Sequence, residues 1–116
     1  MEAVQGVALS VAREGDETVV YARGQLDFAT ESHLAKAVRS AGRAATAACA
    51  LDFEKVTFID SEALKSLLSL RHTLARSGKL LYIRKCSAQV MRTISLLGLD
   101  SSLGCGYSSI ETTQGV

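Results

Sequence analysis

The stretch Val56-Thr57-Phe58-Ile59-Asp60-Ser61-Glu62-Ala63-Leu64 joins an apolar lead-in, residues 56–59, directly to a helix. From Ser61 onward the apolar residues recur at helical spacing, and Gly78 is expected to end the helix. The residues that define this stripe are Leu64, Leu67, Leu68, Leu74 and Ala75. This change of period predicts a helix N-terminus at Ser61, where backbone N–H groups have no partner within the helix.

Strand patterns precede this stretch. Residues 7–11 alternate between apolar and polar, and residues 18–22 are β-branched and aromatic. The turn signal Glu14-Gly15-Asp16 lies between them, so the two segments predict an antiparallel hairpin. Residues 49–53 predict a further short strand with its apolar side chains at every second position.

Helix patterns alternate with these strands. Residues 34–41 carry an apolar stripe at helical spacing, with Asp27 or Thr30 as the cap and Gly42 as the expected end. The segment from Ser87 to Gly98 predicts a third helix of the same kind.

The apolar residues 80–83 predict a strand that is buried on both faces. The Ser- and Gly-rich tail after Asp100 is expected to hold at most one short strand, near Tyr107. Strands that alternate with helices predict right-handed crossovers and a largely parallel sheet. Together with the hairpin, this gives an α/β fold with a mixed four- to five-stranded sheet and three to four helices.

Length and composition narrow the class of protein. The chain has 116 residues, of which 47% are hydrophobic, so we expect one domain over residues 1–116 with a single core. Its 13 basic and 12 acidic residues give a net charge of +1, which offers no global attraction for nucleic acid or anionic lipid. No stretch is apolar enough to span a membrane, and the N-terminus lacks the basic region of a secretory signal.

Signatures of enzymes and metal sites are missing from the sequence. There is no phosphate-binding loop and no nucleophile elbow, and Gly104-Cys105-Gly106 lacks the third glycine of a dinucleotide fingerprint. His33 and His72 are interpreted as surface or boundary residues of helices. We therefore expect a protein that is not an enzyme and that has no metal or cofactor of its own.

The cysteines are odd in number and unevenly spaced, which fits neither a disulfide framework nor a zinc site. Cys49 is expected in the core, Cys86 at a strand end and Cys105 as an accessible thiol. This usage favours the reducing cytoplasm.

Two interpretations of Ser61 remain open from the residues alone. Ser61 or Asp60 could simply cap the helix, which is worth about 1 kcal/mol. Alternatively, Ser61 accepts a phosphoryl group, which the free amides and the dipole of the helix would stabilise. That group would add roughly 1.5 to 2 negative charges beside Asp60 and Glu62 and would act as a switch on binding.

The motifs Gly24-Gln25-Leu26-Asp27, Phe58-Ile59-Asp60-Ser61 and Leu97-Gly98-Leu99, at these separations, resemble the STAS domain family. The resemblance runs from about residue 7 to residue 107 and is strongest to the bacterial anti-sigma factor antagonists. It implies a partner-switch protein whose Ser61 is phosphorylated by a serine kinase that is also the anti-sigma factor. The unphosphorylated form would bind this kinase, which supplies ATP and Mg²⁺, and a PP2C-type phosphatase would reset the switch.

The resemblance also implies partner-binding residues. Asp27 and Asp60 match family aspartates near the partner surface. Glu62 and Ala63 stand where the family usually has a small or hydroxyl residue followed by glycine. Glu62 is therefore expected to weaken kinase docking, to change partner choice or partly to mimic phosphorylation, and Ala63 to limit the closest approach of a partner. The alternative is a STAS regulatory subunit of another assembly, such as a lipid-transport ATPase, or a signalling output other than a sigma factor.

Overall fold

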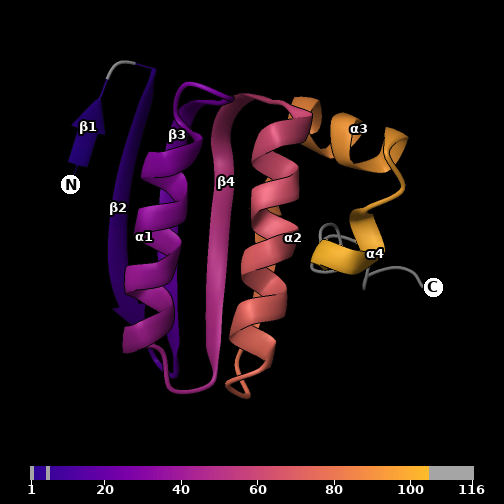
Figure 1. The fold of residues 1–116 in the computed structure, drawn as a ribbon. Coiled ribbons are helices and arrows are strands. Elements are labelled where there is room, and N and C mark those ends of the chain that lie inside the picture. Colours follow the sequence, from indigo (N-terminus) through magenta and orange to yellow (C-terminus); the bar gives the residue numbers. More distant parts are fainter. Residues whose placement is uncertain (1, 5, 105–116) are drawn as a thin grey trace.

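The computed structural model describes residues 2–4 and 6–104, which form an α/β fold with a five-stranded sheet (Figure 1). In chain order the elements are β1 (Glu2–Val4), β2 (Val7–Glu14), β3 (Glu17–Leu26), α1 (Glu31–Ala44), β4 (Ala48–Ile59), α2 (Ser61–Ala75), β5 (Leu80–Cys86), α3 (Ala88–Leu96) and α4 (Asp100–Leu103). The strands lie in the sheet in the order of the sequence.

The sheet is mixed, as the sequence predicts. Strands β1, β2 and β3 form an antiparallel meander, and the β2–β3 pair is the expected hairpin. Strands β3, β4 and β5 are parallel and are connected through α1 and α2. The edge strand β1 has no counterpart in the sequence-based prediction.

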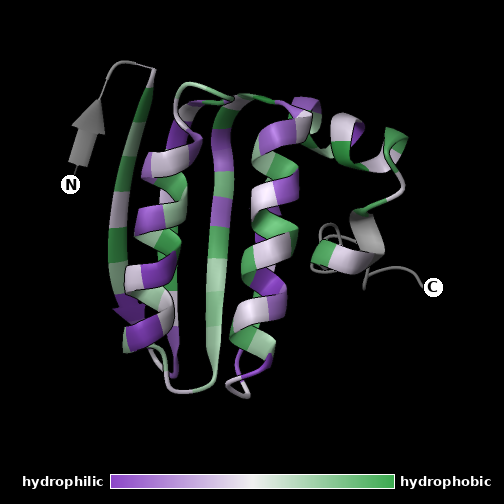
Figure 2. Cartoon of the chain, in the orientation of Figure 1, coloured by the Kyte–Doolittle hydropathy of each residue, from purple (hydrophilic) through white to green (hydrophobic). Residues whose placement is uncertain are grey.

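Helices α1 and α2 lie side by side over one face of the sheet (Figure 1). Both alternate between hydrophilic and hydrophobic residues along each turn, so that each presents an apolar side to the strands (Figure 2). The largest fully buried side chains are Phe53, Leu9, Leu26, Leu34, Leu51, Ile59, Leu64, Leu67, Leu81, Ile83, Ile94 and Leu103. They form one core, and no described helix is long and apolar enough to cross a membrane.

Two predictions about strands are wrong. The apolar lead-in and the short strand before it are one continuous strand, β4, because its second half pairs with β3 from Gly24 to Leu26. Strand β5 is not buried on both faces: Leu81 and Ile83 are buried, whereas Leu80, on the opposite face, is half exposed because α1 and α2 cover only one face of the sheet (Figure 1). The start of the tail forms the short helix α4, and the strand predicted near Tyr107 lies outside the described residues.

Gly42 does not end its helix, since α1 continues to Ala44. The glycine serves a different purpose, which is to let the two helices approach each other. A Cβ atom at Gly42 would lie 3.1 Å from Cδ1 of Leu74 in α2. Packing between helices therefore explains this glycine better than helix termination does.

Gly24 in β3 lies directly against the backbone of Gly6. Its φ of +100° is rare for residues with a side chain, and a Cβ atom there would lie 2.3 Å from the carbonyl oxygen of Gly6. The same oxygen accepts a hydrogen bond from the amide of Gln25 at 2.7 Å. Gly24 therefore allows β3 to lie close to the start of β2 just before the loop that follows Leu26.

We expect Gly24→Ala to lower the free energy of unfolding by about 3 kcal/mol or more, from backbone strain and the clash with Gly6. Gly15→Ala is the matched control, because Gly15 also has positive φ but a Cβ there would meet nothing within 4 Å. That variant should lose only about 1 kcal/mol. Urea unfolding of both proteins measures the difference, and equal losses would contradict the role given to the Gly6 contact.

Candidate functional site

The candidate site lies where the parallel strands β3 and β4 end. Leu26 and Ile59, the last residues of these strands, are paired in register. The loops that follow them lie next to each other at the top of Figure 1. The amide of Asp60 donates a hydrogen bond of 3.0 Å to the carbonyl oxygen of Leu26 and so ties the start of one loop to the other strand.

Asp60 joins the two loops through its side chain. Its Oδ1 accepts a hydrogen bond of 2.9 Å from the amide of Ala63 in α2, and its Oδ2 accepts one of 2.9 Å from the amide of Phe28 in the loop after β3. Asp60 is thus the N-cap of α2, and Ser61 is the first helical residue. The sequence allowed either Ser61 or Asp60 as the cap of this helix, and in the structure the cap is Asp60.

Asp27 organises the loop after β3. Its Oδ1 accepts hydrogen bonds from the amides of Ala29 at 3.0 Å and Thr30 at 3.1 Å. Thr30 is the N-cap residue of α1, but its buried hydroxyl donates to the carbonyl oxygen of Gln25 at 2.9 Å instead of capping the helix. The loop is therefore closed by internal hydrogen bonds before α1 begins.

Ser61 is exposed at the start of α2. Its hydroxyl has no hydrogen-bond partner among the residues that the structure describes, whereas the neighbouring Asp60 uses both carboxylate oxygens. The hydroxyl is therefore not needed for the local fold. It is free to react or to contact another molecule without breaking a bond within the domain.

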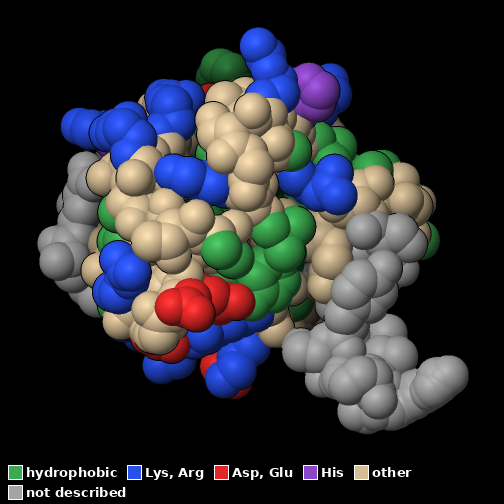
Figure 3. All heavy atoms as spheres, turned by 90° about the horizontal axis from the view of Figure 1, so that it is seen from below, with side chains coloured by type: hydrophobic (Ala, Val, Ile, Leu, Met, Phe, Trp, Pro, Cys, Tyr) green, Lys and Arg blue, Asp and Glu red, His purple; other side chains and the backbone are tan. Residues whose placement is uncertain are grey.

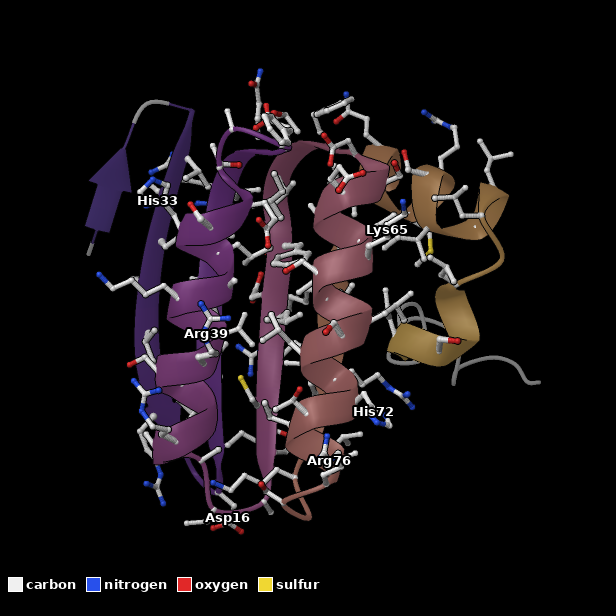
Figure 4. The ribbon with its side chains drawn as sticks, in the orientation of Figure 1. Asp16, His33, Arg39, Lys65, His72 and Arg76 are labelled. Atoms are coloured by element: carbon white, nitrogen blue, oxygen red, sulfur yellow. The ribbon has the colours of Figure 1, made fainter. Side chains whose placement is uncertain are left out.

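Glu62 is exposed beside Ser61, and its carboxylate lies 3.7 Å from the ammonium group of Lys65 one turn along α2. The two side chains are 55% and 73% exposed, so this ion pair is weak and screened by salt. Figure 4 shows Lys65 in the upper part of α2. Glu62 therefore adds an accessible negative charge that Lys65 only partly offsets.

Ala63 does not match the expectation of a partner contact. Its side chain is fully buried in the hydrophobic core, because it lies on the side of α2 that faces the sheet. Only its backbone takes part in the site, through the amide bound by Asp60. We correct the prediction accordingly: Ala63 supports the start of α2 from inside.

Two exposed aromatic residues at this end were missed in the sequence. Phe28, in the loop after β3, is 80% exposed, and Phe58, near the end of β4, is 50% exposed. The available signal was the position of each residue: Phe28 interrupts a polar loop, and Phe58 precedes the buried Ile59 and so points to the opposite side of the strand. Exposed aromatic side chains are typical of surfaces that bind other proteins.

Both ends of the molecule carry charges of both signs. Seen from below, the end opposite Ser61 shows Lys and Arg side chains together with a distinct acidic cluster (Figure 3). At the end that carries Ser61, the acidic residues Asp60 and Glu62 lie near the cation of Lys65.

The histidines and cysteines do not assemble into a site. His33 lies on α1 and His72 on α2, toward opposite ends of the helical layer (Figure 4). No group of three or more His, Cys, Asp or Glu among the described residues could hold a metal ion. Cys49 is buried, and this burial, with the charge of Glu17, raises the pKa of its thiol to about 11; Cys105 lies outside the described residues.

Comparisons with known proteins identify a matching family and several solved structures with a similar fold. A family model described as "Mlab, STAS domain" matches residues 9–104. The crystal structure of an anti-sigma factor antagonist from Mycobacterium paratuberculosis is similar with a TM-score of 0.75 and 23% identity, over 89% of this chain and 87% of that chain. The anti-sigma factor antagonist SpoIIAA from Bacillus, in its unphosphorylated form, gives a TM-score of 0.68 and 19% identity, over 81% and 84% of the two chains.

A transporter contains a similar unit. The murine anion transporter Solute Carrier 26 family member A9 gives a TM-score of 0.65 and 22% identity, over 80% of this chain but 16% of the transporter. No curated protein is matched. At these identities the solved structures show a common fold.

We expect Asp60→Ala to lower the free energy of unfolding by about 2 kcal/mol, because the cap of α2 and the bond to the Phe28 amide are both lost. Ser61→Ala should change it by less than about 0.5 kcal/mol, since the hydroxyl bonds to no described residue. Chemical unfolding of the two variants tests the assignment. A larger loss for Ser61→Ala would show that Ser61 is the structural cap.

Proposed function

Because the chain belongs to the STAS domain family, we propose that it works as a partner-switch protein of the anti-sigma factor antagonist type, with no catalytic activity of its own. Phosphorylation of Ser61 is the switch. The partner in the unphosphorylated state is a serine kinase that also acts as an anti-sigma factor, and both meet in the cytoplasm.

The observation that carries this proposal is the exposed, unbound hydroxyl of Ser61 beside the fully bonded Asp60. A kinase needs a hydroxyl that can enter its active site without unfolding the substrate. Asp60 holds the start of α2 in place, so Ser61 can react while the fold stays intact. The kinase supplies ATP and Mg²⁺.

The physical effect of phosphorylation follows from the surroundings of Ser61. The first amides of α2 and the helix dipole favour a phosphate at this position. The phosphoryl group adds roughly 1.5 to 2 negative charges, next to the carboxylate of Glu62 and on a chain whose net charge is +1. The domain becomes negative overall, and a partner surface that fitted the neutral serine is repelled. A PP2C-type phosphatase returns the protein to the binding state.

We name the exposed residues Phe28, Phe58, Ser61 and Glu62 the switch surface. The aromatic pair supplies apolar area for a partner, and Ser61 and Glu62 supply the polar part. Asp27 and Asp60 contribute to partner binding indirectly, because their hydrogen bonds hold the loops that carry this surface. Support for a phosphorylation switch also comes from SpoIIAA, which has been solved in unphosphorylated and phosphorylated forms.

Incubation of the protein with ATP, Mg²⁺ and the anti-sigma kinase of the same organism should add one phosphoryl group, detected by intact-mass analysis. Ser61→Ala should remain unmodified, because no other hydroxyl replaces Ser61 at the start of α2. The wild-type protein left unmodified within a demonstrated kinase complex would overturn the proposal.

Affinity purification with the wild-type protein and with Ser61→Asp separates the two candidate assemblies. A kinase that is recovered by the wild type and lost with Ser61→Asp supports the partner switch. A transport ATPase that is recovered equally by both proteins would favour the regulatory-subunit alternative.

We expect Phe58→Ala to weaken the kinase complex about tenfold, which corresponds to about 1.4 kcal/mol, because a partner buries this ring. Leu80→Ala is the matched control: Leu80 is 51% exposed, against 50% for Phe58, but lies at the start of β5, away from the switch surface. Titration calorimetry gives both dissociation constants. Equal constants for the two variants would remove Phe58 from the interface.

A further inference from the structure

The sheet has a second face, which α1 and α2 leave uncovered (Figure 1). This face contains a hollow of about 420 Å³, lined by residues of β2, β3, β4 and β5, which we name the sheet hollow. Its volume lies in the range of small-molecule sites, roughly 300 to 1,000 Å³. The site is separate from the switch surface, none of whose residues lines it.

The shape of the hollow follows from residue sizes across the strands. Ser10, Tyr21, Asp52 and Lys85 lie in one row, each paired in register with the next. On β2 the lining side chains are small, Ala8 and Ser10, whereas most of those on β3, β4 and β5 are long. Small residues beside long ones leave a depression that no described side chain fills.

One wall is a fixed network around Arg84. Its guanidinium lies 3.1 Å from the carboxylate of Glu14 and 3.6 Å from that of Asp52, and it donates a hydrogen bond of 3.0 Å to the hydroxyl of Tyr21. The same group lies 5.7 Å from the centre of the Tyr21 ring. The hydrogen bond from Tyr21, followed by that from Arg84, lowers the pKa of Glu14, so the network is charged at neutral pH.

The buried carboxylate of this wall is paired. Asp52 is 7% exposed, with Arg84 at its Oδ2 and the backbone amide of Glu54 at its Oδ1, 3.2 Å away. It therefore repels an incoming anion less than a free carboxylate would, although it shares the single charge of Arg84 with Glu14. Among the lining residues, Glu54 is the other acidic one.

The remaining cations of the hollow have no such partners. Arg23, Lys55 and Lys85 line it, and among the described residues no carboxylate lies within 4.0 Å of their charged groups. All are exposed, so they can move toward a ligand at little cost. Positive charge left unpaired around a hollow attracts anions and raises their local concentration.

We propose that the sheet hollow binds a small polyanion, a molecule with two or more phosphoryl or carboxylate groups, through Arg23, Lys55 and Lys85. The Arg84 network forms its rigid wall and Ser10 offers a hydroxyl on the β2 side. A ligand with several anionic groups suits the hollow best, because its cations come from three neighbouring strands and surround more than one binding position. The site does not depend on the phosphorylation of Ser61.

Titration calorimetry at low ionic strength, with inorganic pyrophosphate and citrate as separate probes, tests the proposal. The wild type should bind at least one probe saturably, and the preferred probe identifies phosphoryl or carboxylate groups as the ligand chemistry. The double variant Lys55→Gln/Lys85→Gln should weaken binding at least about tenfold. Backbone amide shifts in NMR should follow the same probe at Ser10 and Tyr21.

The matched control is Lys36→Gln/Arg39→Gln, which removes two positive charges from exposed residues of α1. Its affinity should stay within about twofold of the wild type, and circular dichroism should show both double variants folded. No saturable binding of either probe, equal weakening in the two variants, or shifts confined to the start of α2 would overturn the proposal.

Discussion

The end of this molecule that carries Ser61 depends on one carboxylate, that of Asp60. It bonds at once to the amide that begins α2 and to the amide of Phe28 in the neighbouring loop, both at 2.9 Å. The parallel pairing of β3 and β4 brings the loops together, but pairing ends at Leu26 and Ile59. Beyond that point the side chain of Asp60 spans the gap between the loops, so the direction of Ser61 and the position of Phe28 are set together.

The sequence predicts the fold well because the spacing of apolar residues along the chain shows which side of each helix or strand is buried. The change of period at Ser61 and the alternation on both sides of it are enough for the α/β class, the hairpin and the start of α2. Which strands pair with each other is harder to predict from the sequence. The continuity of β4 depends on its contacts with β3, and the exposure of Leu80 depends on α1 and α2 covering only one face of the sheet (Figure 1), neither of which is a local property.

The site is only partly predictable for a related reason. Ser61 and Asp60 are visible because capping chemistry is local, yet the choice between them required the geometry. Ala63 follows the exposed residues Ser61 and Glu62, but the helical period places its side chain in the core. Phe28 and Arg84 act through residues far away in the chain, Asp60 and Glu14, so their roles cannot be obtained from spacing alone.

The burial of Cys49 has a chemical consequence of its own. A thiol reacts with alkylating agents and oxidants as the thiolate, and at neutral pH a group with a pKa of about 11 is almost entirely protonated. Its side chain, near the start of β4, is also closed to reagents. Cys49 can therefore be labelled only when this part of the sheet opens, and the rate of labelling measures how often β4 opens there.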